Sequence, residues 1–126
     1  MTQKKLEQLV RKWQKILRLQ DWEIEVKQVG HNDFLEDGRC AQLEASANQK
    51  EGTIKILKPD QYRAWNDKPQ DIEQDVVHEQ AHVYLFAIER YARAGEEEAL
   101  KVAIENAANI FSAALIMLDR KTQRRT

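Results

Sequence analysis

The chain has 126 residues, of which 42% are hydrophobic and 33% are charged, and its formal net charge is −1. This length suits one domain with a single core, and the net charge gives no electrostatic reason to expect a nucleic-acid or membrane partner. The one cysteine, Cys40, excludes an internal disulfide. No continuous apolar run approaches the roughly 18 residues that span a bilayer. We therefore expect a soluble, cytoplasmic protein.

The first half of the chain changes from a helical period to a strand period. Apolar residues over 6–17 recur every three or four positions, which predicts an amphipathic helix. Apolar and charged residues then alternate over 22–27, which predicts a half-buried strand. The same alternation over 41–47 predicts a second strand, and the β-branched segment 53–57 predicts a third, paired with the second in a hairpin.

The second half of the chain is predicted to be helical after a proline-containing loop with at most one helical turn. Asp71 is a suitable N-cap for a helix from residue 72 to about 92. A final helix over 95–120 has acidic residues in its first turn, and a disordered basic tail follows from about 120 to 126. We therefore predict one α+β domain spanning 1–126, with an N-terminal helix, a small, largely antiparallel three-stranded sheet and two long helices.

The segment "HEQAH" places two of the three histidines four residues apart within an apolar helix. Because residues at this spacing lie on one helix face, His78 and His82 are able to bind one zinc ion. Glu79 is then placed to reach a water bound to the metal, as general base, rather than the metal itself. Asp75 would either accept a hydrogen bond from the second ring nitrogen of a histidine ligand and so orient that ring, or be an ordinary surface residue. Coincidence, with the motif facing solvent, is the competing interpretation.

A catalytic zinc ion usually has a third protein ligand, and Glu105 is the favoured candidate. It begins a polar stripe on the last helix, and an antiparallel turn of the chain would bring it back to His82. The stripe would otherwise be the solvent face of that helix. His31 lies far upstream in a loop, Glu89 lies too far along the same helix, and residues 96–98 are better placed to cap the last helix.

These residues resemble those of known metallopeptidase families. "HEQAH" followed by a glutamate on the next helix looks like a gluzincin. The segment "ENAANIFSAALIML" is similar to the E-x-x-A-N-x-F-A-x-x-L-L-M-P segment of the ImmA/IrrE-like metallopeptidases. The segment departs from that pattern at Ser112, Ile116 and Leu118, and the resemblance covers only the last two helices. It implies a zincin-like fold with His78, His82 and Glu105 as zinc ligands and Glu79 as general base.

The resulting hypothesis is a minimal zinc metallopeptidase of phage or bacterial type that acts on a peptide or protein substrate. In peptidases of this type the peptide adds as a strand at the sheet edge, which either 41–47 or 53–57 would supply. The donor that stabilises the developing oxyanion is left open among Tyr62, Tyr84, Tyr91 and His31. The alternative function is a non-catalytic regulatory or interaction protein stabilised by its metal. The substrate sequence and the oligomeric state are not predicted.

Overall fold

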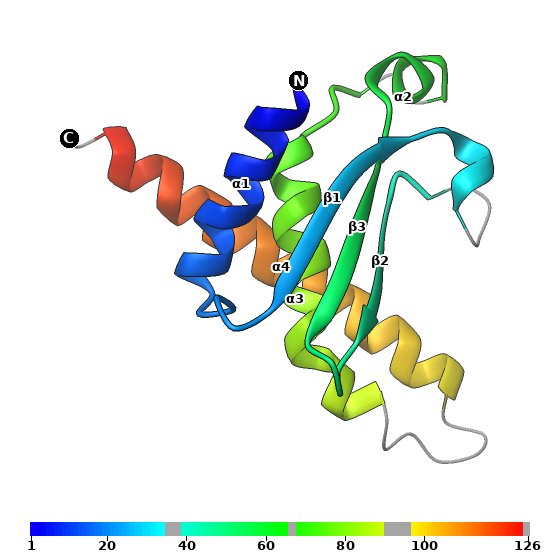
Figure 1. Cartoon of the computed structure of the whole chain (residues 1–126), viewed down its shortest axis with the longest axis vertical. Helices are drawn as coiled ribbons and strands as arrows, with labels where there is room; N and C mark the ends of the chain where they lie inside the picture. The colour runs from blue at the N-terminus through cyan, green and yellow to red at the C-terminus, as the bar shows by residue number, and fades with distance from the viewer. Residues whose placement is uncertain (35–38, 66–67, 90–96, 125–126) are drawn as a thin grey trace.

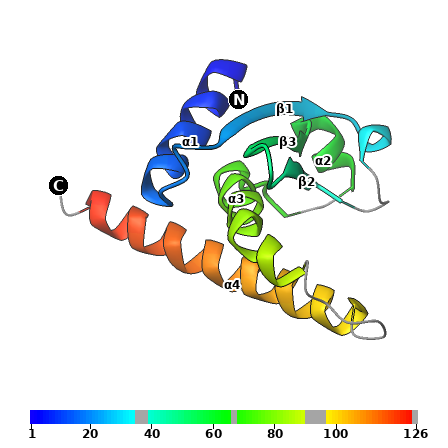
Figure 2. The same ribbon diagram turned by 60° about the horizontal axis from the view of Figure 1, so that its bottom comes forward.

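The computed structural model describes residues 1–34, 39–65, 68–89 and 97–124. The elements follow the order α1 (Gln3–Ile16), β1 (Glu23–Val29), the 3₁₀ turn η1 (His31–Asp33), β2 (Ala41–Ser46), β3 (Glu51–Leu57), α2 (Pro59–Trp65), α3 (Ile72–Glu89) and α4 (Glu97–Arg124). Figure 1 shows α1 and α3 beside the sheet, and Figure 2 shows α3 lying between the sheet and α4. The predicted α+β class is confirmed.

The sheet is mixed, with the strand order β1-β3-β2. The predicted hairpin of β2 and β3 is antiparallel, whereas β1 pairs with β3 in parallel. The expectation of a largely antiparallel sheet is therefore correct for the pairing of β2 with β3 and wrong for the pairing of β1 with β3. The three strands alternate in direction along the chain, so placing β3 in the centre makes its pairing with β1 parallel. The sequence left open whether β2 or β3 supplies the edge that binds a peptide. Because β3 is central, only β2 of these two strands has a free edge.

The outer edge of β1 is covered by side chains of α1. Three of them donate hydrogen bonds to carbonyl groups of β1 or of the residue before it: Gln3 Nε2 to Val26 at 2.7 Å, Arg11 Nη1 to Ile24 at 3.0 Å and Gln14 Nε2 to Trp22 at 2.9 Å. These carbonyls belong to alternate residues and therefore all point away from β3. Three of the acceptors that an unpaired edge would offer to another strand are thus already satisfied.

The core lies between the inner face of the sheet and the helices α1 and α3. Its largest cluster contains residues from five elements: Leu6, Val10, Ile24, Val26, Ala41, Ile54, Ile56 and Val76. A second cluster of Trp13, Val77 and Ile116 joins α1, α3 and α4. The alternation seen in the sequence thus divides a buried face of the sheet from a polar outer face.

The helix boundaries agree with the sequence at the start of α3 and differ at the end of α4. Asp71 Oδ1 accepts a hydrogen bond from the Gln74 N–H at 3.1 Å, which confirms the predicted N-cap. The expected disordered tail from residue 120 is wrong, because α4 continues to Arg124. Arg120 Nη2 lies 3.2 Å from Asp71 Oδ1 and 3.6 Å from Glu73 Oε1. These ion pairs anchor the last turns of α4 against the start of α3.

Within the described residues, α4 is the one helix long and apolar enough to cross a membrane. The candidate segment is Glu97–Gln123, in which the most apolar 18-residue window has a mean hydropathy of 1.3 and is 22% buried. The expectation that no continuous apolar run reaches this length still holds, because Glu105 and several polar residues interrupt the segment. Length and composition alone are weak evidence for a membrane span, because core helices of soluble proteins meet the same criteria.

Candidate metal centre

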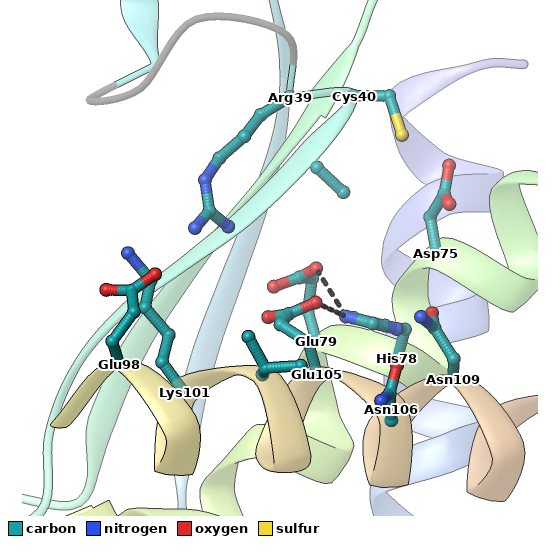
Figure 3. A pocket seen from close by; sticks show the side chains of 12 residues that line it. Arg39, Cys40, Asp75, His78, Glu79, Glu98, Lys101, Glu105, Asn106 and Asn109 are labelled. Carbon is teal, nitrogen blue, oxygen red and sulfur yellow. Dashed lines mark ion pairs between the residues drawn. The ribbon is translucent and has the colours of Figure 1, made fainter. Parts of the chain in front are cut away.

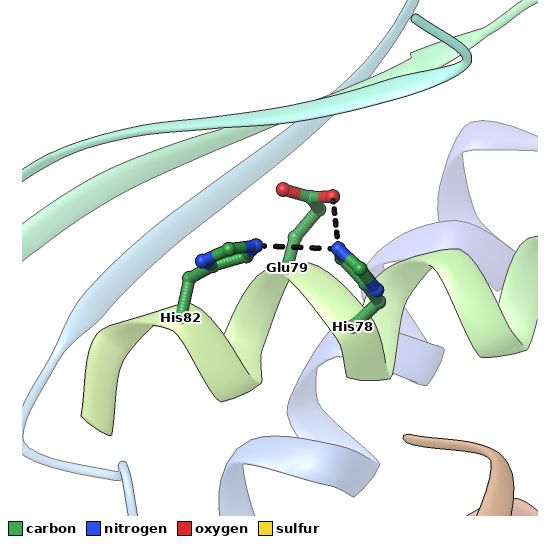
Figure 4. Close-up of side chains that lie close together, drawn as sticks. All are labelled: His78, Glu79 and His82. Atoms are coloured by element: carbon green, nitrogen blue, oxygen red, sulfur yellow. Dashed lines mark hydrogen bonds and ion pairs between the residues drawn. The ribbon is translucent and has the colours of Figure 1, made fainter. Parts of the chain in front are cut away.

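The HEQAH segment lies in the middle of α3, and its two imidazoles converge. His78 Nε2 and His82 Nε2 are 3.2 Å apart, with the Glu79 carboxylate beside them (Figure 4). The three side chains together form a group whose possible ligand atoms all lie within 4.8 Å of one another. The one-turn spacing produces this arrangement, because residues four apart are stacked on the same helix face. The cluster is therefore compatible with binding of a metal ion.

Glu105 reaches the same point from α4. Its Oε1 lies 3.0 Å from His82 Nε2, and its Oε2 lies 3.3 Å from His78 Nε2. Ile104 and Ala108, which flank it on the inner side of α4, are buried. This packing of α4 against α3 turns Glu105 toward the histidines. The structure thus brings together all three residues that the sequence proposed as ligands.

The separations among these atoms fit a tetrahedral metal. Zinc binds imidazole nitrogen and carboxylate oxygen at about 2.0–2.2 Å, which places neighbouring ligand atoms of a tetrahedron about 3.3–3.5 Å apart. The two imidazole nitrogens are 3.2 Å apart, close to that edge length, and each lies near a different oxygen of Glu105, His82 Nε2 at 3.0 Å from Oε1 and His78 Nε2 at 3.3 Å from Oε2. Two imidazole nitrogens and a carboxylate also form a donor set typical of catalytic zinc. The residues present therefore fit the ion.

Glu79 is buried beneath the edge of β2. Only 4% of the residue is exposed, and its Oε2 lies 3.9 Å from His78 Nε2. Burial raises the pKa of Glu79 to about 8, and the neighbouring Glu105 carboxylate contributes to this rise, whereas Arg39 and a hydrogen bond from the Leu43 backbone N–H oppose it. A carboxyl group with this pKa is close to the range in which it both accepts and releases a proton.

His82 is also affected by burial. Removal from water is the largest cause that lowers the pKa of its imidazole, the charges of His78 and Arg39 lower it further, and the Glu105 carboxylate opposes them. A lower pKa keeps the ring neutral near pH 7, so that its nitrogen lone pair remains available. The neutral form is the one that binds a metal ion.

A pocket of about 500 Å³ opens beside these residues, between α3, α4 and the start of β2. Figure 3 shows Arg39 and Lys101 at one end of it and Cys40 above Asp75 at the other. Burial is the main cause that raises the pKa of the Cys40 thiol to about 11. Since a nucleophilic cysteine must be a thiolate, Cys40 is not suited to covalent catalysis near neutral pH.

Asp75 occupies neither of the positions that the sequence suggested. Its side chain points into the pocket toward Cys40 (Figure 3), and its buried Oδ2 has no hydrogen-bond partner among the described residues. No hydrogen bond joins it to His78, although both residues are described. Burial and the Asp71 carboxylate raise the pKa of Asp75 to about 7. The residue is therefore an acid on the pocket wall.

The other residues considered as a third metal ligand do not join the histidine cluster in the described part of the chain. His31 is exposed on η1, and its backbone N–H donates to Gln61 Oε1 at 2.9 Å. Glu97 and Glu98 lie in the first turn of α4, where Glu98 also lines the pocket. Glu96 and the side chain of Glu89 lie outside the described residues.

Two of the tyrosines considered as oxyanion donors have other surroundings. The Tyr84 hydroxyl donates to the Leu17 carbonyl at the end of α1, and Tyr62 is 9% exposed in the core. Neither lines the pocket. Tyr91 lies outside the described residues.

The polar stripe of α4 runs from the pocket, where Asn109 is exposed, into the protein interior at Ser112. Glu105 and Asn109 line the pocket, and Ser112 is fully buried, donating its hydroxyl to the Asn109 carbonyl at 3.1 Å. Sequence reasoning missed Arg39 and Lys101 as pocket residues. No periodicity or motif identifies them, because they come together only when β2 and α4 pack on opposite sides of α3.

Comparison with known protein families, curated proteins and solved structures finds no match for this chain. The sequence resemblance to gluzincins and ImmA/IrrE-like peptidases therefore stays a hypothesis. The His-Glu-x-x-His cluster, compatible with a metal site, is what the structure adds.

Proposed function

We propose that this protein is a zincin-like, zinc-dependent peptidase. The observation that supports the proposal most directly is the triangle of groups formed by the two imidazoles and the Glu105 carboxylate, in which the nearest ligand atoms of each pair are 3.0–3.3 Å apart and the carboxylate turns one oxygen to each ring. The nearly buried carboxylate of Glu79 lies next to this triangle. In this proposal His78, His82 and Glu105 hold the ion. A donor set with three protein ligands leaves a coordination position for water or substrate.

Glu79 supplies proton transfer in this scheme. A zinc ion in the site would lower the pKa of a coordinated water toward about 7 and polarise a substrate carbonyl. Glu79 takes the proton of the attacking water and delivers it to the departing amine. The Leu43 backbone N–H holds its carboxylate, and Arg39 favours its charged form. These two contacts counteract the burial that would otherwise keep Glu79 protonated.

The peptide substrate would lie along the outer edge of β2. Because the Cys40 carbonyl accepts from the Leu57 N–H at 2.8 Å, the next residues facing β3 are 42, 44 and 46. The backbone groups of Ala41, Leu43 and Ala45 point the other way, and the Leu43 N–H reaches Glu79. An extended peptide paired with this edge would pass beside Glu79, which is the geometry of strand addition.

A non-catalytic role is the second candidate, and the position of Glu105 on a separate helix favours it. A metal ion shared by α3 and α4 would fix α4 in place and raise the stability of the folded chain. Such a protein would act through a partner, with the ion as a structural clip. A buried acid that does not complete the ligand triangle is of no use in that role, which makes Glu79 the discriminating residue.

The test combines metal analysis with hydrolysis by the full chain. We expect purified protein to contain one zinc ion and to cleave an unstructured peptide mixture, and Glu79→Gln to keep the zinc while hydrolysis falls by at least about 10²-fold. Zinc in both proteins with no hydrolysis by either would support the structural clip. Failure of the wild-type chain to bind any divalent cation would refute both candidates.

A cytoplasmic location and the absence of a nucleic-acid partner belong to the same proposal. They rest on the free thiol of Cys40 and on a net charge close to zero.

A further inference from the structure

α4 has a second apolar face, directed away from the rest of the protein. Its large side chains are unusually exposed: Ile110 at 71%, Phe111 at 61%, Met117 at 70% and Leu118 at 61%. Small exposed residues lie between them at Ala113 and Ala114, and Ala103 lies two turns before Ile110 on the same side of the helix. We call these seven residues the outer face of α4. Isolated exposed apolar residues are common, but a contiguous set of this size on one helix is typical of an interaction surface.

The outer face is separate from the metal centre. The opposite side of α4 is buried every fourth residue at Ile104, Ala108, Ser112 and Ile116, and that side packs against α3. Glu105 is the one charged residue between 102 and 118, and it points toward the two histidines of α3. The outer face is therefore uncharged over about four helical turns. Figure 2 shows α4 as the outermost layer of the molecule.

We propose that the outer face binds a second copy of this chain, with the two α4 helices packed antiparallel. A two-fold axis between residues 110 and 111 would place Ile110 opposite Phe111 of the second copy. The same axis would place Ala103 opposite Leu118, so that a small residue faces a large one. Small residues opposite large ones allow two helices to approach and interdigitate.

The charges at the two ends of α4 favour the antiparallel arrangement. Near the start of the helix Glu97, Glu98 and Lys101 give a net charge of −1, whereas Asp119, Arg120, Lys121 and Arg124 near its end give +2. An antiparallel pair brings each acidic end beside the basic end of the other copy, and the helix dipoles also oppose one another favourably. A parallel pair would bring like charges together.

The exposed area is sufficient for a weak to moderately stable dimer. From the exposed fractions of its four large side chains, the outer face presents about 600 Å² per copy, hence about 1,200 Å² in a pair if all of it is buried, at the lower limit of specific interfaces. A patch of this size lies at the upper limit of what monomers expose. We therefore expect a dimer that dissociates on dilution.

Sedimentation velocity and light scattering on the full-length chain would test this proposal. We expect a mass approaching twice the 14.8 kDa of the chain at roughly 100 μM, with dissociation on dilution to about 1 μM. Ile110→Glu and Phe111→Lys should each give a monomer, because each would bury an unpaired charge. Mixing the two variants should restore a dimer. In the mixed dimer, the carboxylate introduced at position 110 of one copy lies opposite the ammonium group introduced at position 111 of the other. The second contact keeps the native pair of Phe111 and Ile110.

Ile16→Lys is the matched control, since Ile16 is exposed to 45% but lies on α1. It should dimerise like the wild type. Circular dichroism should show native helix content in every variant, because the substituted side chains are exposed. A wild-type chain that remains monomeric at roughly 100 μM, a dimer that survives both substitutions, or a mixture that stays monomeric would overturn the proposal. Flotation of a monomeric chain with phosphatidylserine-containing vesicles, abolished by Ile110→Glu, would overturn it in favour of a membrane surface.

Discussion

The two edges of the sheet differ in how their backbone groups are used. At β1, side chains of α1 occupy the outward carbonyls of Trp22, Ile24 and Val26. At β2, the outward N–H of Leu43 instead binds the carboxylate of Glu79, next to the candidate metal centre. An edge strand can pair with another chain unless its polar groups are occupied. The comparison indicates that α1 protects one edge while the other is directed to the site.

The largest effect is expected for Glu105→Ala, which removes the contribution of α4 to the site beside β2. Loss of one of three ligands should weaken zinc binding by about 100-fold or more. Competition with a zinc chelator measures this, with Glu98→Ala as control because Glu98 lines the same pocket outside the triangle. Unchanged affinity would place the third ligand elsewhere.

The protected edge is tested by Gln14→Ala. Gln14 is 4% exposed, and its Nε2 donates to the carbonyls of Leu19 at 3.0 Å and Trp22 at 2.9 Å. Its removal eliminates both hydrogen bonds and the acceptor of a third, donated by Arg11 Nη1, and should lower the free energy of unfolding by about 2 kcal/mol. Urea denaturation measures this, and zinc affinity should not change. A loss of zinc binding equal to that of Glu105→Ala would mean that the two edges are not independent.

The open edge is tested by Ala45→Pro. The Ala45 N–H points away from β3, so proline removes a donor to a bound peptide without removing a hydrogen bond of the sheet. We expect KM for peptide hydrolysis to rise by about tenfold, corresponding to about 1.4 kcal/mol, with zinc content unchanged. Ala45→Val retains the N–H and serves as control. Equal KM values in the two variants would argue against strand addition at β2.

The pH dependence of stability tests the burial of Glu79 under β2. Its folded pKa of about 8 exceeds the ordinary value of 4.5, so the folded, metal-free chain binds more protons than the unfolded chain between these values. The free energy of unfolding should therefore fall as pH rises from about 5 to about 8, and this contribution is absent in Glu79→Gln. With chelator present, the wild type should lose at least about 1 kcal/mol more than the variant over this range. Parallel pH profiles would show that Glu79 is solvated.

The sequence predicted the parts of the site that lie on one helix. The one-turn spacing of His78 and His82 is a local property of any α-helix, so their convergence needed no tertiary information. The Asp71 cap and the strand alternation are local in the same sense. Glu105 was selected by its polar position on an apolar helix and by family resemblance, and the packing of α4 brings it within 3.3 Å of both histidines.

What the sequence determined by itself is therefore the three long helices, the three strands and the two histidines with their glutamate, whereas the seven-residue helix α2 lies where a loop was predicted. Tertiary structure decided the strand order, the edge that faces the site, the pocket residues Arg39 and Lys101, and the exposure of the outer face of α4. The physical reason is the range of the interactions. Helix spacing and strand alternation are fixed by backbone geometry over a few residues, whereas these other features depend on which surfaces exclude water together.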